Sequence, residues 1–304
     1  MRICVTGSSG QIGSYVVDEC ASRGIEAVGL DLRPSRWTAV VGDVRDREAV
    51  ARAARGADAL IHLAAHVSVT GSLADPIHDA STNVLGTIAA IEGAAAARVG
   101  RFVLVSSAAV YGAPRRLPLR EDDDLAPISP YGVGKMAAER YVRVLAPERG
   151  VGATIARPFN VYSPRQDPSS PYAGVMSRFA RAVADAEAPT VFGDGSATRD
   201  FVHAADVARW LVALAREPCG GEIEAVNLAS GRETSVLSLA EAFCSAAGAP
   251  LRPSHAPPRP GEISRSVADV AKARARGLAP TVAVDAGIRE MVEHARGKAK
   301  APTP

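Results

Sequence analysis

A glycine-rich turn near the N terminus constrains the fold more than any other feature of the sequence. Residues 6–13 read TGSSGQIG, after the apolar run Arg2–Thr6 and before the helical pattern Gln11–Ser22. Its three glycines allow a tight strand-to-helix turn and close approach of a pyrophosphate to the helix N terminus, where N–H groups and the helix dipole favour an anion. The spacing therefore predicts a dinucleotide site at the end of the first β-strand.

Asp31 extends this prediction to the type of dinucleotide. It closes the second apolar run, Ala27–Asp31, about twenty residues beyond the turn, where a carboxylate can accept hydrogen bonds from the adenosine ribose. A carboxylate there would repel a 2′-phosphate, so the pattern favours NAD over NADP, although nearby Arg33 weakens the preference. The alternative role for Asp31 is a helix or turn cap. Asp43 and Val44 follow the third strand and could reach the adenine, or Asp43 could be a solvated loop residue.

Strand and helix patterns alternate through the first half of the chain. Further apolar runs occupy Ala59–Ala64, Phe102–Ser106 and Gly152–Ala156, and they alternate with helical patterns over Asp46–Ala54, Thr82–Arg98 and Ser129–Ala146. Continuous apolar strands alternating with helices are typical of a parallel sheet that is covered on both faces. The sequence therefore predicts an α/β fold with a Rossmann-type doubly wound parallel sheet.

This alternation ends after Arg157. Ser163–Pro171 holds three prolines and three serines and is expected to be a loop, and a helix is expected over Val175–Ala186. A turn is expected at Gly193–Gly195, and residues 250–262 hold five prolines and no clear element.

We therefore expect two domains. Residues 1–157 would form the NAD-binding Rossmann domain, with part of 200–230 returning to it. Residues 158–304 would form a smaller C-terminal α/β substrate-binding lobe, ending in a disordered tail over 297–304.

Composition excludes several classes of protein. The 35 basic and 33 acidic residues give a net charge of +2, which indicates neither a nucleic-acid nor a membrane partner. The four cysteines lack metal-ligand spacing, so reduced thiols are expected. Met1 runs directly into the first strand and no apolar run has the length of a membrane span, so we expect a cytoplasmic protein without a signal peptide.

Tyr131 and Lys135 are the strongest candidates for catalysis. They are four residues apart on a predicted helix that Ser129 can cap, so their side chains share one face. A tyrosine with its ordinary pKa of about 10 is a poor base at neutral pH, but a nearby ammonium and an oxidised nicotinamide would lower that pKa. Ser106 and Ser107 follow a buried strand, at the edge where α/β sheets bind ligands. A surface tyrosine with a solvated lysine is the alternative interpretation.

Motifs along nearly the whole chain resemble those of the extended short-chain dehydrogenase/reductase family, and specifically its nucleotide-sugar 4-epimerase branch. They are the glycine turn, HLAA (62–65), NVLGT (83–87), SSAAVYG (106–112), the Tyr131–Lys135 pair, RPFNVY (157–162), GDG (193–195), RDFVH (199–203) and RPGE (259–262). Two positions depart from the family pattern, Gly134 in place of serine and Ser163 in place of glycine. Neither departure removes a reacting group.

The resemblance implies a role for each matching residue. It implies that Ser107 is the catalytic hydroxyl, Tyr131 the base and Lys135 the lysine that binds the nicotinamide ribose. The implied NAD contacts are Gly7, Ser9, Gly10, Gln11, Ile12, Gly13, Asp31, Asp43, Val44, Leu63, Ala64, Ala65, Asn83, Tyr131, Lys135 and Pro158. The implied substrate contacts are Ser107, Tyr131, Phe159, Asn160, Arg165, Val175, Arg199, Arg259, Glu262 and Ser266. No metal site is expected, and the acidic run Glu121–Asp124 is interpreted as a solvated loop.

The reaction implied is C4 epimerisation of a UDP-sugar through a 4-keto intermediate with tightly held NAD. Ala108 and Ala109 stand where dehydratases of the family carry an Asp-Glu pair, which disfavours 4,6-dehydration. A 4-ketoreductase or a decarboxylase remains an alternative. A non-catalytic NAD-binding regulatory protein is an alternative of another class, although such a protein would be expected to lack Tyr131, Lys135 or the hydroxyl at position 107.

Two residues bear on which sugar is used. A small residue at Ser266 would leave room for an N-acetyl group, and Arg165 could face a uronate carboxylate. UDP-glucose, UDP-N-acetylglucosamine and UDP-glucuronate therefore all remain candidates.

The resemblance also implies a homodimer through the helices Thr82–Arg98 and Ser129–Ala146.

Overall fold

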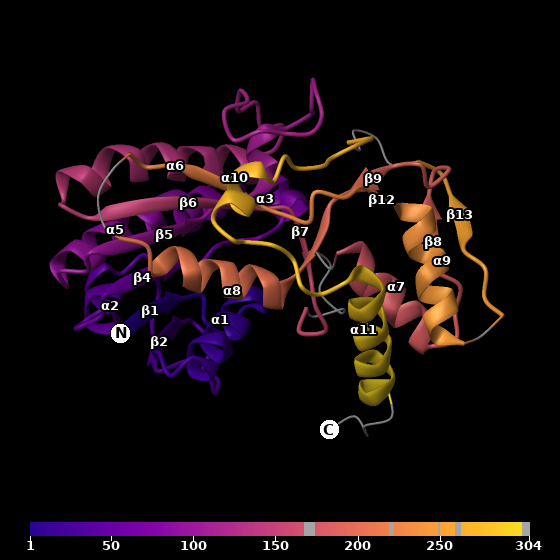
Figure 1. The fold of residues 1–304 in the computed structure, drawn as a ribbon, viewed down its shortest axis with the longest axis horizontal. Helices are drawn as coiled ribbons and strands as arrows, with labels where there is room; N and C mark the ends of the chain where they lie inside the picture. The colour runs from indigo at the N-terminus through magenta and orange to yellow at the C-terminus, as the bar shows by residue number, and fades with distance from the viewer. Residues whose placement is uncertain (167–173, 219–221, 249, 259–262, 300–304) are drawn as a thin grey trace. The chain divides into compact units, whose positions relative to one another are not determined.

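The computed structural model describes residues 1–166, 174–218, 222–248, 250–258 and 263–299 (Figure 1). The chain divides into two compact units. Unit 1 comprises residues 1–113, 121–158 and 207–228, and unit 2 comprises residues 114–120, 159–206 and the chain from 229 onward. The segment 207–228 therefore returns to the N-terminal unit.

A seven-stranded parallel sheet forms the centre of unit 1 (Figure 1). Its order is β11–β6–β5–β4–β1–β2–β3, and each neighbouring pair is parallel. The strands are β1 (Arg2–Thr6), β2 (Glu26–Asp31), β3 (Val40–Val41), β4 (Ala59–His62), β5 (Arg101–Val105), β6 (Gly152–Pro158) and β11 (Ala225–Leu228). The chain first adds strands on one side of β1 and then on the other, so the winding reverses beside β1. The predicted Rossmann-type doubly wound sheet is confirmed.

Helices cover both faces of this sheet (Figure 1). They are α1 (Gln11–Ser22), α2 (Arg47–Ala53), α3 (Val69–Ala74), α4 (Pro76–Ala80), α5 (Gly86–Ala96), α6 (Pro130–Glu148) and α8 (Ala204–Ala215, in unit 1 from Val207), with the short helices η1 (Ser81–Leu85) and η2 (Ala108–Tyr111). Residues of α2, α5 and α6 pack with Leu60, Phe102 and Ile155 of the sheet in one buried apolar cluster. Side chains alternate along each strand, so the residues next to these three in their strands point to the opposite face of the sheet, on the side of α1 and α8.

Most element boundaries in unit 1 agree with the sequence patterns to within a few residues. Ser129 accepts a hydrogen bond from the Gly132 N–H (3.1 Å), and Pro130 opens α6, as the cap pattern predicts. The predicted helix over 82–98 is in part wrong, since its first turn is π-helical and it ends at Ala96. The predicted strand over 59–64 ends at His62, because the Ala64 N–H donates to Thr6 Oγ1 (3.2 Å).

Unit 2 is built from short strands and three longer helices. Its strands pair as β7 (Asn160–Tyr162) with β10 (Phe201–His203), β8 (Thr190–Phe192) with β13 (Ser254–Ala256), and β9 (Thr198–Arg199) with β12 (Thr234–Ser235). Its helices are α7 (Val175–Ala184), α9 (Val236–Ala247), α10 (Ala271–Ala275) and α11 (Val284–Ala299). The helices α7, α9 and α11 share an apolar core that includes Phe179, Phe243 and Met291.

Two predictions for unit 2 are wrong. Residues 254–256 form β13 within the segment expected to hold no element, because they pair with β8. Residues 297–299 continue α11 instead of beginning a disordered tail, and residues 300–304 lie outside the described part of the chain. Across the described ranges, no helix has the length and apolar character that a membrane crossing requires.

Candidate active site

The glycine turn between β1 and α1 leaves no room for a side chain at Gly7 or Gly13. Gly7 has φ of 72°, and a Cβ there would lie 2.7 Å from the Ala64 nitrogen. A Cβ on Gly13 would lie 2.1 Å from the Gly7 oxygen. Gly10 caps α1 without a side-chain hydrogen bond, so no cap side chain covers the helix N terminus that Gln11 and Ile12 begin. The turn therefore fits a pyrophosphate bound close to the backbone.

Asp31 is held beside this turn at the end of β2. Its Oδ2 accepts the Ser9 N–H (2.9 Å), and its Oδ1 accepts the Arg33 N–H (3.0 Å). The Arg33 guanidinium donates to the Ser9 carbonyl (2.9 Å). The turn-capping role is thus present, and the remaining lone pairs of the carboxylate can still accept ribose hydroxyls.

Asp43 and Val44 occupy different environments after β3. The Asp43 carboxylate accepts hydrogen bonds from Arg45 Nε (3.0 Å) and the Arg45 N–H (2.8 Å), and the hydrogen bond from the Arg45 side chain lowers the pKa of Asp43. Asp43 is therefore a partly exposed loop residue whose carboxylate is paired with Arg45, and a contact with the adenine stays a prediction. Val44 is buried in the core.

Asn83 organises the segment that follows β4. Its Oδ1 accepts the His66 N–H (2.9 Å), and its Nδ2 donates to the His66 carbonyl (3.1 Å). These two bonds fix the chain just after Leu63, Ala64 and Ala65, at the carboxyl edge of the sheet. Asn83 thus shapes the wall of the predicted cofactor site, and a direct contact with NAD stays a prediction.

Ser107, Tyr131 and Lys135 come together at the same edge of the sheet. Tyr131 and Lys135 lie on α6 against the end of β5, where Lys135 Nζ donates to the Val105 carbonyl (3.0 Å) and Ser107 is close enough to Tyr131 to affect its pKa. Burial raises the pKa of Tyr131 to about 12, against the effect of the Ser107 bond. Burial lowers the pKa of Lys135 to about 8, against the attraction of Asp79 and Glu139. The phenol is thus protonated at neutral pH unless a further positive charge lies beside it.

Asp79 is a site residue that the sequence analysis missed. It is 1% exposed, and its Oδ1 shares hydrogen bonds with His66 Nδ1 (3.0 Å) and Asn83 Nδ2 (3.1 Å). A Cβ on Gly134 would lie 3.2 Å from Asp79 Oδ2, so this carboxylate lies beside the turn of α6 that carries Lys135. The only signal in the sequence is its position, four residues before Asn83.

A buried polar network joins β6 and β11 of the sheet to Tyr111 of η2 and to Glu121. Arg157 Nη1 donates to the Tyr111 hydroxyl (2.9 Å) and to the Glu121 carbonyl (3.1 Å). The Tyr111 hydroxyl donates to Asn227 Oδ1 (2.6 Å), and the Asn227 N–H donates to Glu121 Oε1 (2.8 Å). Glu121 is therefore tied into unit 1, and interpreting it as part of a solvated acidic loop is wrong.

The predicted substrate residues of unit 2 gather in part around residues 198–200. Asn160 Nδ2 donates to the Asp200 carbonyl (3.1 Å), and the Ser266 N–H donates to the Thr198 carbonyl (3.2 Å). Asn160 and Ser266 are thus hydrogen-bonded to the short segment that carries Arg199. Phe159 is buried, Arg165 follows β7 and Val175 begins α7. Arg259 and Glu262 lie outside the described residues.

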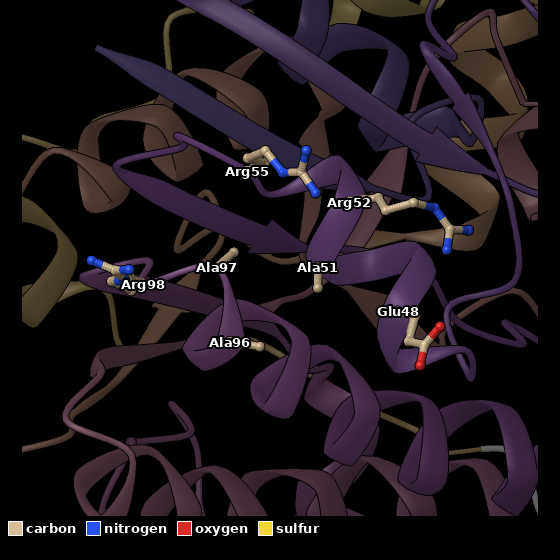
Figure 2. A pocket seen from close by; sticks show the side chains of 7 residues that line it. All are labelled: Glu48, Ala51, Arg52, Arg55, Ala96, Ala97 and Arg98. Atoms are coloured by element: carbon tan, nitrogen blue, oxygen red, sulfur yellow. The ribbon is translucent and has the colours of Figure 1, made fainter.

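A hollow of about 630 Å³ lies elsewhere on unit 1 (Figure 2). Its lining residues are Glu48, Ala51, Arg52, Arg55, Ala96, Ala97 and Arg98. Arg55 and Arg98 come shortly before β4 and β5 begin, so the hollow is at the amino edge of the sheet. Figure 2 shows the three guanidinium groups lying apart rather than converging on one point. Ligands of such sheets bind at the carboxyl edge, so this hollow is not the candidate site.

Comparison with known proteins agrees with this geometry. Residues 3–229 match the model of the NAD dependent epimerase/dehydratase family. The chain belongs to this family. A UDP-glucose 4-epimerase of Mycolicibacterium smegmatis is 38% identical over 316 residues, which cover 99% of this chain and all of the relative. The resemblance to the epimerase branch of the family is confirmed.

Solved structures of this NAD-dependent family match both units. A UDP-glucose 4-epimerase of Thermotoga maritima, solved with UDP-glucose, has a TM-score of 0.91 at 32% identity and covers 99% of this chain and 100% of its own. A UDP-N-acetylglucosamine 4-epimerase of Methanobrevibacter ruminantium M1, in complex with UDP-N-acetylmuramic acid, has a TM-score of 0.91 at 27% identity, with 98% of each chain covered.

Proposed function

We propose that this chain catalyses the C4 epimerisation of a UDP-sugar through a 4-keto intermediate, with NAD retained throughout. The observation that carries the proposal is that Tyr131 and Lys135, both buried on one face of α6, meet the end of β5 just before Ser107, where Lys135 Nζ donates to the Val105 carbonyl (3.0 Å). This group lies at the sheet edge that also holds the glycine turn. The names of the relatives support the same reaction.

The residues have distinct tasks in this reaction. Bound NAD supplies the acceptor and donor for the hydride at C4. Burial raises the pKa of Tyr131, and the positive charges of Lys135 and of a nicotinamide bound beside it would lower that pKa, so that the phenolate could take the proton of the sugar 4-hydroxyl. Ser107, whose hydrogen bonding also lowers the pKa of Tyr131, would bridge this proton transfer. After the keto sugar rotates in the site and presents its other face, Tyr131 returns the proton to the oxygen at C4.

A 4,6-dehydration is disfavoured by the chain itself. Ala108 and Ala109 follow Ser107 in the short helix η2, and their methyl groups cannot transfer protons. A 4-ketoreductase or a decarboxylase on the same scaffold remains the alternative, since either would use the same Tyr131–Lys135 pair.

A product assay without added cofactor tests the proposed reaction. The protein is incubated separately with UDP-glucose, UDP-N-acetylglucosamine and UDP-glucuronate, and the products are identified by NMR. A C4 epimer from any of them supports epimerisation with retained NAD and names the sugar. Consumption of UDP-glucuronate with loss of its carboxylate would indicate a decarboxylase. No product from any of the three, with NAD released on denaturation, would favour a reductase or a regulatory protein.

Replacing Asp31 by Ala is expected to weaken NAD binding by about 10- to 100-fold, the loss expected for hydrogen bonds to a charged group, and NADP binding much less. Titration of cofactor-free protein with each dinucleotide measures both affinities. Asp58→Ala is the control, because Asp58 accepts the Arg2 N–H (2.8 Å) at the other end of the sheet. Equal losses for NAD and NADP would rule out the ribose contact.

Replacing Ser266 by Tyr is expected to lower kcat/KM selectively for UDP-N-acetylglucosamine, because the larger side chain removes the space for the acetyl group. Ser266 is half-buried, whereas Ser264 two residues earlier is exposed, so Ser264→Tyr is the matched control. The ratio of kcat/KM for UDP-glucose and UDP-N-acetylglucosamine is the measurement. A ratio unchanged from the parent protein would exclude Ser266 as the selecting residue.

We also propose that the enzyme is a cytoplasmic homodimer that assembles through α5 and α6. In support, Val133, Tyr141 and Val144 are 47%, 43% and 62% exposed in unit 1 and share one face of α6. Three of the cysteines, Cys4, Cys20 and Cys244, are buried free thiols, as expected for a reducing compartment, and Cys219 lies outside the described residues.

A further inference from the structure

The two neighbouring serines after β5 have different partners. The Ser107 hydroxyl accepts the Ala109 N–H (3.2 Å), and hydrogen bonding from Ser107 lowers the pKa of Tyr131. Ser106 donates its hydroxyl proton to Glu139 Oε1 (2.6 Å), and its N–H donates to the Ala156 carbonyl (2.8 Å). The reaction steps proposed above use only Ser107, so they do not explain the buried bond from Ser106 to Glu139.

The carboxylate that receives Ser106 is held rigidly. Arg157 binds Glu139 with both arms of its guanidinium, from Nε to Oε1 (2.9 Å) and from Nη2 to Oε2 (2.7 Å). Glu139 is 1% exposed and Arg157 is 2% exposed. A bidentate pair fixes the plane of the carboxylate, and the Tyr111 network described above fixes Arg157 in turn.

Three successive turns of α6 contact three consecutive residues at the end of β5. Lys135 Nζ donates to the Val105 carbonyl, Glu139 accepts the Ser106 hydroxyl, and Tyr131 lies close enough to Ser107 for that serine to lower its pKa. Tyr131, Lys135 and Glu139 are spaced i, i+4, i+8, so they line one face of the helix. The position of the Ser107 hydroxyl relative to Tyr131 therefore depends on all three contacts.

We propose that Glu139, held by Arg157, is a positioning residue that acts through Ser106 to place the Ser107 hydroxyl against Tyr131. This inference rests on the proposed function. Loss of the Ser106 bond would free the strand end to move while leaving each reacting group in the protein. Displacement of a reacting group by about 1 Å can lower a rate by about 100-fold.

The test is Ser106→Ala, which removes one hydroxyl and leaves the Glu139–Arg157 pair intact. With the UDP-sugar that the wild-type protein epimerises, we expect kcat of the variant to fall by about 10- to 100-fold. Its KM and its content of retained NAD should stay close to those of the wild-type protein. Ser106→Thr, which keeps a hydroxyl, should restore most of kcat. The matched control is Thr154→Val, which removes another buried hydroxyl on β6 that an arginine contacts, Arg101 Nη2 at 2.5 Å. Its kcat should stay close to wild type.

Several outcomes would overturn the inference. One is a kcat for Ser106→Ala equal to that of Thr154→Val. Another is an equal loss of kcat in Ser106→Ala and in Ser106→Thr. A third is loss of kcat that accompanies an equal loss of bound NAD or of melting temperature beyond that of the control, since that would indicate a structural role. If the wild-type protein itself epimerises none of the three UDP-sugars, the proposed function fails, and this inference fails with it.

Discussion

Replacing Tyr131 by Phe is expected to lower kcat on the order of 10³-fold, in the range typical of a lost general base. The substitution removes only the hydroxyl that bonds to Ser107. Lys135 keeps its bond to the Val105 carbonyl, and the glycine turn is unchanged, so NAD should remain bound. The measurements are kcat on the preferred UDP-sugar and the amount of NAD released on denaturation.

The matched control for this substitution is Tyr141→Phe. Tyr141 lies on the same helix but is 43% exposed, so the loss of its hydroxyl should leave kcat and NAD content unchanged. Near-normal turnover of Tyr131→Phe would remove Tyr131 as the base. Loss of NAD from the variant would instead place its hydroxyl in cofactor binding.

Replacing Glu139 by Ala is expected to destabilise the protein by about 3–5 kcal/mol, the usual cost of removing one partner from a buried ion pair. The substitution leaves the Arg157 guanidinium, 3% exposed, without its carboxylate. Burial lowers the pKa of Arg157, and the bond to Glu139 raises it above its ordinary value. An arginine side chain stays protonated in proteins even without such a partner, so the substitution would leave a buried charge unpaired with a carboxylate. Urea denaturation followed by circular dichroism measures the loss of stability.

The control for this prediction is an ion pair at the surface of the same unit. Glu92 binds Arg149 (2.8 Å), with side chains 25% and 42% exposed, so Glu92→Ala should cost far less stability. An equal shift of the urea midpoint for Glu92→Ala and Glu139→Ala would contradict the importance of the buried pair.

The features that the sequence predicted best are those with local physical causes. The glycine turn is encoded within eight residues, because a Cβ on Gly7 or Gly13 would clash with nearby backbone. Ser129 and Pro130 start α6, and the spacing of Tyr131 and Lys135 then places both on one face. Asp31 ends its strand beside the turn, as its spacing indicates, and it also caps the turn through the Ser9 N–H.

The features that the sequence did not predict depend on how separate elements pack together. Glu139 of α6 meets Arg157 because α6 packs against β6, and no pattern within either element encodes that contact. The sequence around Asp79 indicates only a helical residue. The structure shows that its carboxylate bonds to Asn83 of η1 and to His66. The strand β13 lacks an apolar pattern, since two of its three residues are exposed, and pairing with β8 defines it.

The most direct test of the proposed reaction follows the hydrogen at C4 of the sugar. The protein is incubated in ordinary water with UDP-glucose deuterated at C4, without added NAD, and the products are examined by NMR and mass spectrometry. Hydride transfer to retained NAD and back predicts a C4 epimer that still carries deuterium at C4. No epimer from this substrate or from the other two UDP-sugars, or an epimer that has exchanged its C4 deuterium for solvent hydrogen, would contradict the proposed function.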